Sequence, residues 1–145
     1  STVWMERPIG WWLKRLDELI DARFAACYAD VGLDRRQWQV LNVLAPHPRP
    51  ATEVAAALAP FWDDTGTDAV KTLERLAEQA LTMRTQDGRW AMTAAGESKR
   101  SMASDAVEGI RARMSRRVSS NDYQVTIDVL SQMAANLSEP TDQGS

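Results

Sequence analysis

The residues that most often carry catalysis are scarce in this 145-residue chain, which has one histidine, His47, and one cysteine, Cys27. A metal cage or a Cys–His nucleophile pair needs at least two such side chains. Carboxylates are frequent, but no Gly-rich phosphate loop or nucleophile elbow accompanies them. His47 lies in the proline-rich connector APHPRP, and Cys27 lies on the apolar stripe of a helix, where packing is its ordinary role. We therefore expect a protein that is not an enzyme and that holds no metal or cofactor.

The charged residues set a condition on any nucleic-acid partner. The formal net charge is -3 at pH 7 and the pI is about 5.2, so a polyanion must be met by a local basic patch. Between residues 63 and 89 the acidic side chains outnumber the basic ones. A basic surface in this region requires the fold to gather Arg49, Lys71, Arg84 and Arg89 on one side. We expect a second basic cluster to be a solvated helix face; it consists of Arg111, Arg113, Arg116 and Arg117.

Apolar residues recur at steps of three and four over most of the chain, which is the spacing of amphipathic helices. The pattern predicts helices over residues 8–30, 34–45, 51–59, 95–118 and 121–137, and a further helix that is capped by Thr65 or Thr67 and runs to residue 81. Asp34 followed by Gln37 predicts a capping box at the start of the second helix, and Thr93 is the expected cap of the fifth. The fold class is therefore mainly α.

One segment, LTMRTQDGRWAMTAAGE at residues 81–97, breaks the helical pattern. Its two short apolar runs flank Asp87-Gly88, a strong hairpin signal. We expect Leu81 and Met83 to point inward from the first strand, and Trp90 and Met92 from the second. Three helices followed by a hairpin are the layout of a winged helix-turn-helix, in which the third helix enters the major groove of DNA and the hairpin lies beside it.

The first and last helices carry more apolar and aromatic surface, including Trp4, Trp11 and Trp12, than one chain of this size buries. We expect dimerisation helices over about 4–30 and 95–137, a winged-helix DNA-binding lobe over about 34–93 and a frayed tail over 138–145. The sequence has no signal-peptide pattern and no apolar run near the roughly 18 residues that span a bilayer. We therefore expect a cytoplasmic homodimer with no membrane partner.

The order of these elements and the segments ATEVAAALA, TDAVKTLERLAEQALTMR and DGRWAMTAAGE resemble the MarR family of bacterial transcriptional regulators. The resemblance covers nearly the whole chain, from PIGWWLKRLDELID to the last helix. It implies a winged helix-turn-helix homodimer that binds double-stranded DNA and releases it when a small molecule or an oxidant acts near the junction of the dimer and DNA lobes. By this match, the positions that contact DNA are Thr52, Thr67, Asp68, Lys71, Thr72, Arg84 and Arg89.

The sequence departs from the family pattern in three places. The turn Asp87-Gly88-Arg89 is shorter than the family's usual wing loop. The loop APFWDDTGT is longer than the usual turn and carries Asp63 and Asp64, whose charges oppose phosphate. Ala80 stands where the family commonly has glycine, at little cost if the backbone there stays helical. The short wing and acidic loop favour an alternative function, a ligand-sensing or protein-interaction module with a MarR-like fold that has lost DNA binding.

The aromatic residues indicate where an effector would bind. We expect Trp12, Phe24 and Trp38 to line a pocket between the dimer helices and the DNA lobe. Trp62, in the enlarged loop, either covers that pocket or docks on the DNA lobe. Flat aromatic walls suit a small aromatic effector. The alternative is that these side chains only pack in the core and the dimer interface.

Overall fold

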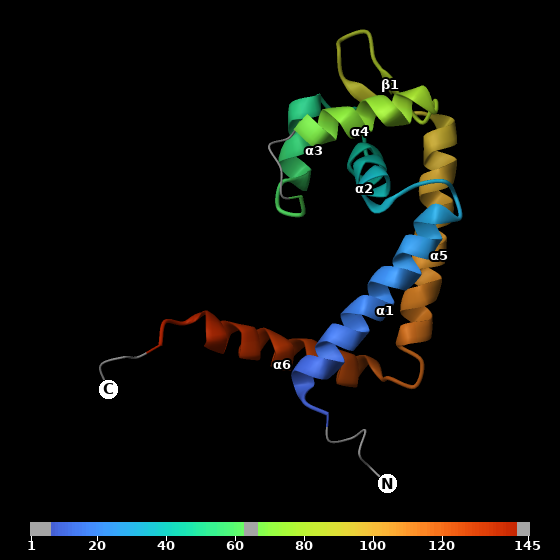
Figure 1. The fold of residues 1–145 in the computed structure, drawn as a ribbon. Helices are drawn as coiled ribbons and strands as arrows, with labels where there is room; N and C mark the ends of the chain where they lie inside the picture. The colour runs from blue at the N-terminus through green and yellow to red at the C-terminus, as the bar shows by residue number, and fades with distance from the viewer. Residues whose placement is uncertain (1–6, 63–66, 142–145) are drawn as a thin grey trace. The chain divides into compact units, whose positions relative to one another are not determined.

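The computed structural model describes residues 7–62 and 67–141. Within these ranges the elements follow the predicted order, with the hairpin between the fourth and fifth helices (Figure 1): α1 (Ile9–Ala29), α2 (Arg35–Leu44), α3 (Ala51–Leu58), α4 (Thr67–Glu78), β1 (Thr82–Arg84), β2 (Trp90–Met92), α5 (Ala94–Met114) and α6 (Ser120–Ser138). The predicted mainly helical fold is confirmed. Trp4, Asp63 and Asp64 lie outside the described residues. None of the described helices combines the length and apolar character that a membrane crossing needs.

The chain divides into two compact units, one up to Ile110 and one from Arg111 onward. The first has a continuous hydrophobic core to which α1 to α5 and the hairpin contribute, including Cys27, Leu41, Val54, Leu73, Trp90 and Val107. Burial raises the pKa of the Cys27 thiol, in keeping with the packing role expected for it. In the second unit, α6 has no buried residue.

The predicted caps of α2 and α5 are both present. The Asp34 side chain accepts a hydrogen bond from the Gln37 N–H at 2.8 Å, and the Gln37 side chain accepts one from the Asp34 N–H at 3.0 Å. At the start of α5, the Gly96 N–H donates to Thr93 Oγ1 at 3.0 Å. Each cap joins residues three positions apart, so it is determined locally.

The helices α1 and α4 end in the same Schellman geometry. Leu33 N–H donates to the Tyr28 carbonyl at 2.9 Å with Gly32 at φ 77°, and Leu81 N–H donates to the Leu76 carbonyl at 2.9 Å with Ala80 at φ 63°. This backbone normally takes glycine. Our prediction of a helical backbone at Ala80 is therefore wrong, and the left-handed alanine costs about 1 kcal/mol. As a result α4 ends at Glu78 rather than at residue 81.

The strands β1 and β2 pair antiparallel, with Met83 opposite Ala91. The prediction that Met83 points inward is wrong, because Met83 is 52% exposed while Thr82 is buried and donates its hydroxyl to the Leu73 carbonyl at 2.9 Å. Leu81 belongs to the turn that ends α4, so the alternation of inward-facing and outward-facing side chains in β1 begins one residue later, at Thr82. Trp90 is buried and Met92 half-buried, as expected.

The base of the hairpin is closed by a close approach between α5 and the end of α4. A Cβ on Gly96 would lie 2.2 Å from the Leu81 carbonyl oxygen, so this position in MTAAGE has no room for a side chain. The Thr93 hydroxyl donates to the Ala80 carbonyl at 2.7 Å. These contacts fix the hairpin beside the end of α4.

Candidate nucleic-acid interface

The helix α4 has one buried and one exposed face. Ala69, Leu73 and Leu76 are at most 1% exposed and pack in the core, where α4 contacts α2 and α3. Their spacing of four and three places them on one stripe. The other side of the helix is exposed, and we call it the outer face of α4; it consists of Val70, Lys71, Glu74, Arg75 and Glu78.

Of the predicted DNA contacts on α4, Lys71 lies on the outer face. Asp68 and Thr72 are half-buried and engaged elsewhere: the Thr72 hydroxyl donates to the Asp68 carbonyl at 2.7 Å, and the Asp68 carboxylate accepts from Arg36 Nη1 at 3.0 Å. The side chain of Thr67 lies outside the described part of the chain. Of the three predicted contacts on α4 whose side chains are described, Lys71 is therefore the best placed to reach a partner.

Four residues of the outer face were not among the predicted contacts, namely Val70, Glu74, Arg75 and Glu78. The helical period could have identified them, because residues four apart lie one turn above each other. Val70 and Glu74 are related in this way, as are Lys71 and Arg75. Cations, a carboxylate and an aliphatic group are the side-chain types that read base edges in the major groove.

The two predicted wing residues are exposed, and each has an internal contact. The Arg84 guanidinium lies 5.0 Å from the centroid of the Trp90 ring, and Arg89 Nε lies 3.3 Å from the Asp87 carboxylate. Asp87 also accepts a hydrogen bond from the Thr85 hydroxyl, which with Arg89 holds the Asp87 pKa below its ordinary value. The wing tip is thus a compact turn in which the charge of Arg89 faces an acid.

Thr52 lies at the start of α3, and Arg49 lies just before this helix. Thr52 is exposed in the first turn of the helix, where a phosphate contact is sterically open. Arg49, however, donates from Nε to the Val43 carbonyl at 2.9 Å, and its backbone pairs with that of Trp90 at 2.9 and 2.8 Å. The guanidinium is therefore tied through its Nε atom to the end of α2.

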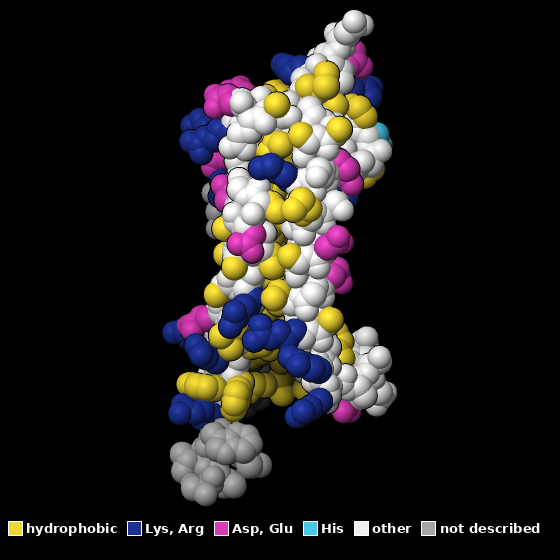
Figure 2. Space-filling model, turned by 90° about the vertical axis from the view of Figure 1, so that its right-hand side faces the viewer, with side chains coloured by type: hydrophobic (Ala, Val, Ile, Leu, Met, Phe, Trp, Pro, Cys, Tyr) yellow, Lys and Arg dark blue, Asp and Glu magenta, His cyan; other side chains and the backbone are white. Residues whose placement is uncertain are grey.

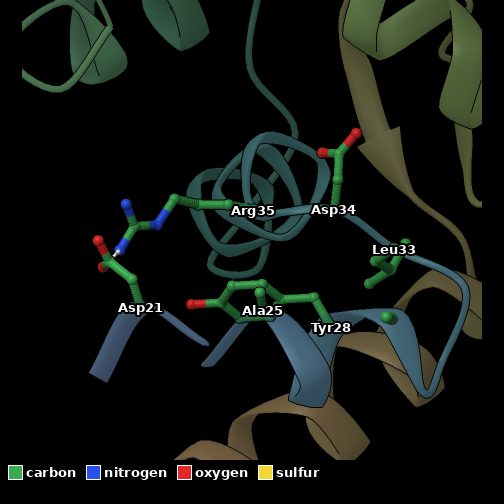
Figure 3. Close-up of a pocket in the computed structure, with 7 residues that line it drawn as sticks. Asp21, Ala25, Tyr28, Leu33, Asp34 and Arg35 are labelled. Atoms are coloured by element: carbon green, nitrogen blue, oxygen red, sulfur yellow. Dashed lines mark hydrogen bonds and ion pairs between the residues drawn. The ribbon is translucent and has the colours of Figure 1, made fainter. Parts of the chain in front are cut away.

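A cavity of about 390 Å³ lies where α1 meets α2. Its apolar lining includes Tyr28 and Leu33, and Figure 3 shows Asp21 and Arg35 at one end, joined by an ion pair of 3.2 Å. The ring of Tyr28 stacks on that of Trp38 with centroids 5.0 Å apart and planes at 28°. The cavity therefore combines one aromatic wall with a rim of opposite charges.

The four residues predicted to bind an effector do not line this cavity. Phe24 and Trp38 are half-buried against the core, and Trp38 reaches the cavity only through Tyr28. Trp62 is 5% exposed and donates to Gln39 Oε1 at 2.7 Å, so it docks on α2 of the DNA lobe, one of the two alternatives considered. Trp12 lies near the start of α1, about 24 Å along the helix from Tyr28 at 1.5 Å per residue. One chain does not bring Trp12 and Trp38 to the same pocket.

The comparisons with known proteins agree with this architecture. Residues 33–96 match a family model described as a winged helix DNA-binding domain. No curated protein compared with the sequence matches it.

Solved structures of MarR family regulators superpose on most of the chain. A MarR family transcriptional regulator from Rhodococcus sp. RHA1 has 22% identity and a TM-score of 0.67, covering 87% of this chain and 93% of its own. The Mycobacterium tuberculosis MarR family protein Rv2887, in complex with DNA, has 19% identity and a TM-score of 0.67, covering 88% and 98%. CouR from Rhodococcus jostii RHA1, bound to p-coumaroyl-CoA, has 21% identity and a TM-score of 0.66, covering 92% and 96%.

The matched domain contains α2 to α4 and the hairpin, the elements that carry the outer face of α4 and the wing. Among the similar structures, the Rhodococcus sp. RHA1 protein is described as a transcriptional regulator and CouR as a transcriptional repressor. Residues 33–96 thus match the model of a winged helix DNA-binding domain, and the chain has the fold of the MarR family transcriptional regulators.

Proposed function

We propose that this protein is a transcriptional regulator that binds double-stranded DNA as a homodimer. The observation that carries the proposal is the outer face of α4, which is exposed, polar and adjacent in the chain to the hairpin of a winged helix-turn-helix. Lys71 and Arg75 meet base edges or nearby phosphates in the major groove, while Glu74 and Val70 suit a cytosine amino group and a thymine methyl. Thr52, Arg84 and Arg89 contact the backbone. A regulator of this kind acts in the bacterial cytoplasm.

The local charge supports this assignment better than the sequence count does. Asp68 is paired with Arg36, a cation that lies outside residues 63–89 in the sequence. This pair offsets one of the acidic charges that oppose phosphate in this region. Among the described residues of α4, Glu74 and Glu78 still face solvent on the outer side.

The exposed hydrophobic side chains support a homodimer. On α1, Ile9, Leu13 and Leu16 are 45–50% exposed, and on α6, Val125, Ile127 and Val129 are 43–49% exposed. Figure 2 shows hydrophobic side chains open to solvent on the face that carries α1 and α5. A second copy of the chain offers a surface of the same apolar character. In an isologous interface the same surface of each copy is covered by the other copy. Light scattering at micromolar protein is the test, and a monomer would exclude this assembly.

The cavity between α1 and α2 supports regulation by a small aromatic molecule. Its Tyr28 wall, backed by Trp38, offers a stacking surface, and the Arg35–Asp21 pair offers a charged group at one end. CouR, one of the similar structures, is bound to p-coumaroyl-CoA, which is an aromatic acyl-CoA. A ligand that binds one α1–α2 arrangement better than another shifts the spacing of the two DNA lobes in the dimer. Trp38→Ala is expected to abolish release from DNA by such a compound and to leave ligand-free binding within a few fold.

The experiment that tests DNA binding is selection of bound duplexes from a random pool. The expected outcome is a pseudo-palindromic consensus whose half-sites lie about one helical turn apart. A second function remains in view because both wing arginines have internal contacts, Arg84 with Trp90 and Arg89 with Asp87. Failure to enrich any sequence would favour that function, a ligand-sensing or protein-interaction module that has lost DNA binding.

A further inference from the structure

Trp62 is the last described residue before α4, and it is bound to α2. Its indole Nε1–H donates to Gln39 Oε1 at 2.7 Å, and only 5% of the residue is exposed. The Arg36 guanidinium lies over its ring, 4.5 Å from the centroid. Two consecutive turns of α2 thus hold this aromatic side chain.

The same guanidinium also contacts the first turn of α4. Arg36 Nη1 lies 3.0 Å from Asp68 Oδ2. The two side chains are 44% and 42% exposed, and an ion pair at such exposure stabilises little by itself. Here, however, the cation is shared with the Trp62 ring, so one side chain of α2 contacts the chain on both sides of residues 63–67.

The first turn of α4 needs such contacts more than the rest of the helix. Leu73 and Leu76 anchor the second and third turns in the core, but among the described side chains of the first turn the buried one is Ala69. Because an alanine contributes little apolar contact, the direction of the first turn depends more on polar contacts from α2.

We propose that Arg36, Gln39, Trp62 and Asp68 form a clasp that positions the N-terminal end of α4 for reading DNA, with Arg36 as the positioning residue. This inference rests on the proposed function. The clasp holds the first turn in one orientation before DNA arrives, so binding does not have to order it. It also pairs the Asp68 carboxylate with a cation, which lowers its repulsion of phosphate.

Arg36→Gln and Arg35→Gln make a matched pair for the test. Both remove one cation from the first turn of α2. Each breaks an ion pair with a described aspartate, which is Asp68 on α4 for Arg36 and Asp21 on α1 for Arg35. On a duplex selected by the native protein, Arg36→Gln is expected to weaken binding about fivefold, the size of one cation–π contact and one exposed ion pair. Arg35→Gln is expected to stay within about twofold of the native protein. Equal losses in both variants would overturn the proposal.

Trp62→Phe separates positioning from charge, because it removes the indole N–H and changes no charge. It is expected to weaken DNA binding about threefold, the loss of about one hydrogen bond, with the salt dependence unchanged. Arg36→Lys is expected to restore most of the affinity lost in Arg36→Gln. A different outcome would be a loss of DNA affinity in Arg36→Gln alone, with a slope of log affinity against log salt that is lower by about one and with unchanged binding in Trp62→Phe. That outcome would mean that Arg36 contacts a phosphate rather than positions α4.

Hydrogen exchange without DNA tests the clasp independently of the proposed function. Lys71 and Thr72 carry the first amides of α4 that have an intrahelical acceptor. Their exchange is expected to be several-fold faster in Arg36→Gln and Trp62→Phe than in Arg35→Gln, in protein shown by its thermal transition to be folded. If no duplex is selected, the proposed function fails, and the exchange rates of these two amides then decide by themselves whether the clasp exists. Unchanged exchange at both amides would overturn the clasp.

Discussion

The helices α4 and α6 both expose a long side, but the two sides differ in chemistry. α4 buries Ala69, Leu73 and Leu76 and exposes Lys71 and Arg75. α6 has no buried residue, and Tyr123, Ile127 and Leu137, which share one stripe of the helix, are 43–89% exposed. Exposed charges on α4 are stable in water and available to an anion, whereas the apolar side of α6 gains free energy only against another apolar surface.

Under the proposed function, this difference gives the two helices different partners. A polar helix face beside a hairpin fits a nucleic acid, which binds through charge and hydrogen bonds. An apolar helix without a core fits a second copy of the chain, which binds through burial of hydrophobic area. Substitutions on each helix should therefore affect one kind of binding and leave the other intact.

The largest effect is expected for Ile127→Glu on α6. A carboxylate in an apolar dimer interface has lost its hydration and costs about 3 kcal/mol or more, which raises the dimer dissociation constant at least about 100-fold. Gln132→Glu is the matched control, since it adds the same charge at an exposed polar position of the same helix. Light scattering at micromolar protein measures the result. An Ile127→Glu variant that stays dimeric would remove α6 from the interface.

The next effect is expected for Lys71→Ala on α4. Loss of a cation in the groove is expected to weaken DNA binding about tenfold and to lower the slope of log affinity against log salt by about one. The dimer should be unchanged. Lys14→Ala, which removes the same charge from an exposed position of α1, is the control. Fluorescence anisotropy over a salt series measures DNA affinity in both variants. An equal loss of affinity in Lys71→Ala and Lys14→Ala would mean that only the net charge of the protein matters.

A smaller effect is expected at the wing, where Arg89 is already paired with Asp87. Arg89→Ala is expected to weaken all sequences alike by about threefold and to flatten the salt slope by about one unit. Asp87→Asn is expected to act in the opposite direction, since it frees Arg89 and removes a repelling charge. An unchanged slope in Arg89→Ala would exclude this residue from the interface and strengthen the alternative function.

The smallest effect concerns the end of α4. Ala80→Gly relieves the left-handed alanine but increases the freedom of the unfolded chain, so the free energy of unfolding is expected to rise by only about 0.5 kcal/mol. Gly32→Ala at the corresponding position of α1 should lower it. Denaturant unfolding followed by circular dichroism measures both. A destabilised Ala80→Gly variant would mean that the alanine methyl group makes a compensating contact.

The order of the elements, their approximate bounds and the class of fold follow from local sequence patterns alone. The Asp34–Gln37 capping box, the Thr93 cap and the Asp87-Gly88 hairpin are all present in the structure. Each of these features joins residues a few positions apart, so a local pattern is enough to predict it. The apolar spacing likewise placed Leu73 and Leu76 in the core.

Only the tertiary structure decided how the candidate interface is arranged. Asp68 and Trp62 are held by Arg36 and Gln39, which lie 32 and 23 positions away in the sequence, and no local pattern pairs them. Arg49 points to the end of α2 because its backbone bridges Trp90, a pairing set by the position of the hairpin. The backbone of Ala80 is also set by tertiary contacts. The close packing of Gly96 against Leu81 and the hydrogen bond from the Thr93 hydroxyl to the Ala80 carbonyl hold Ala80 in a left-handed conformation that alanine disfavours.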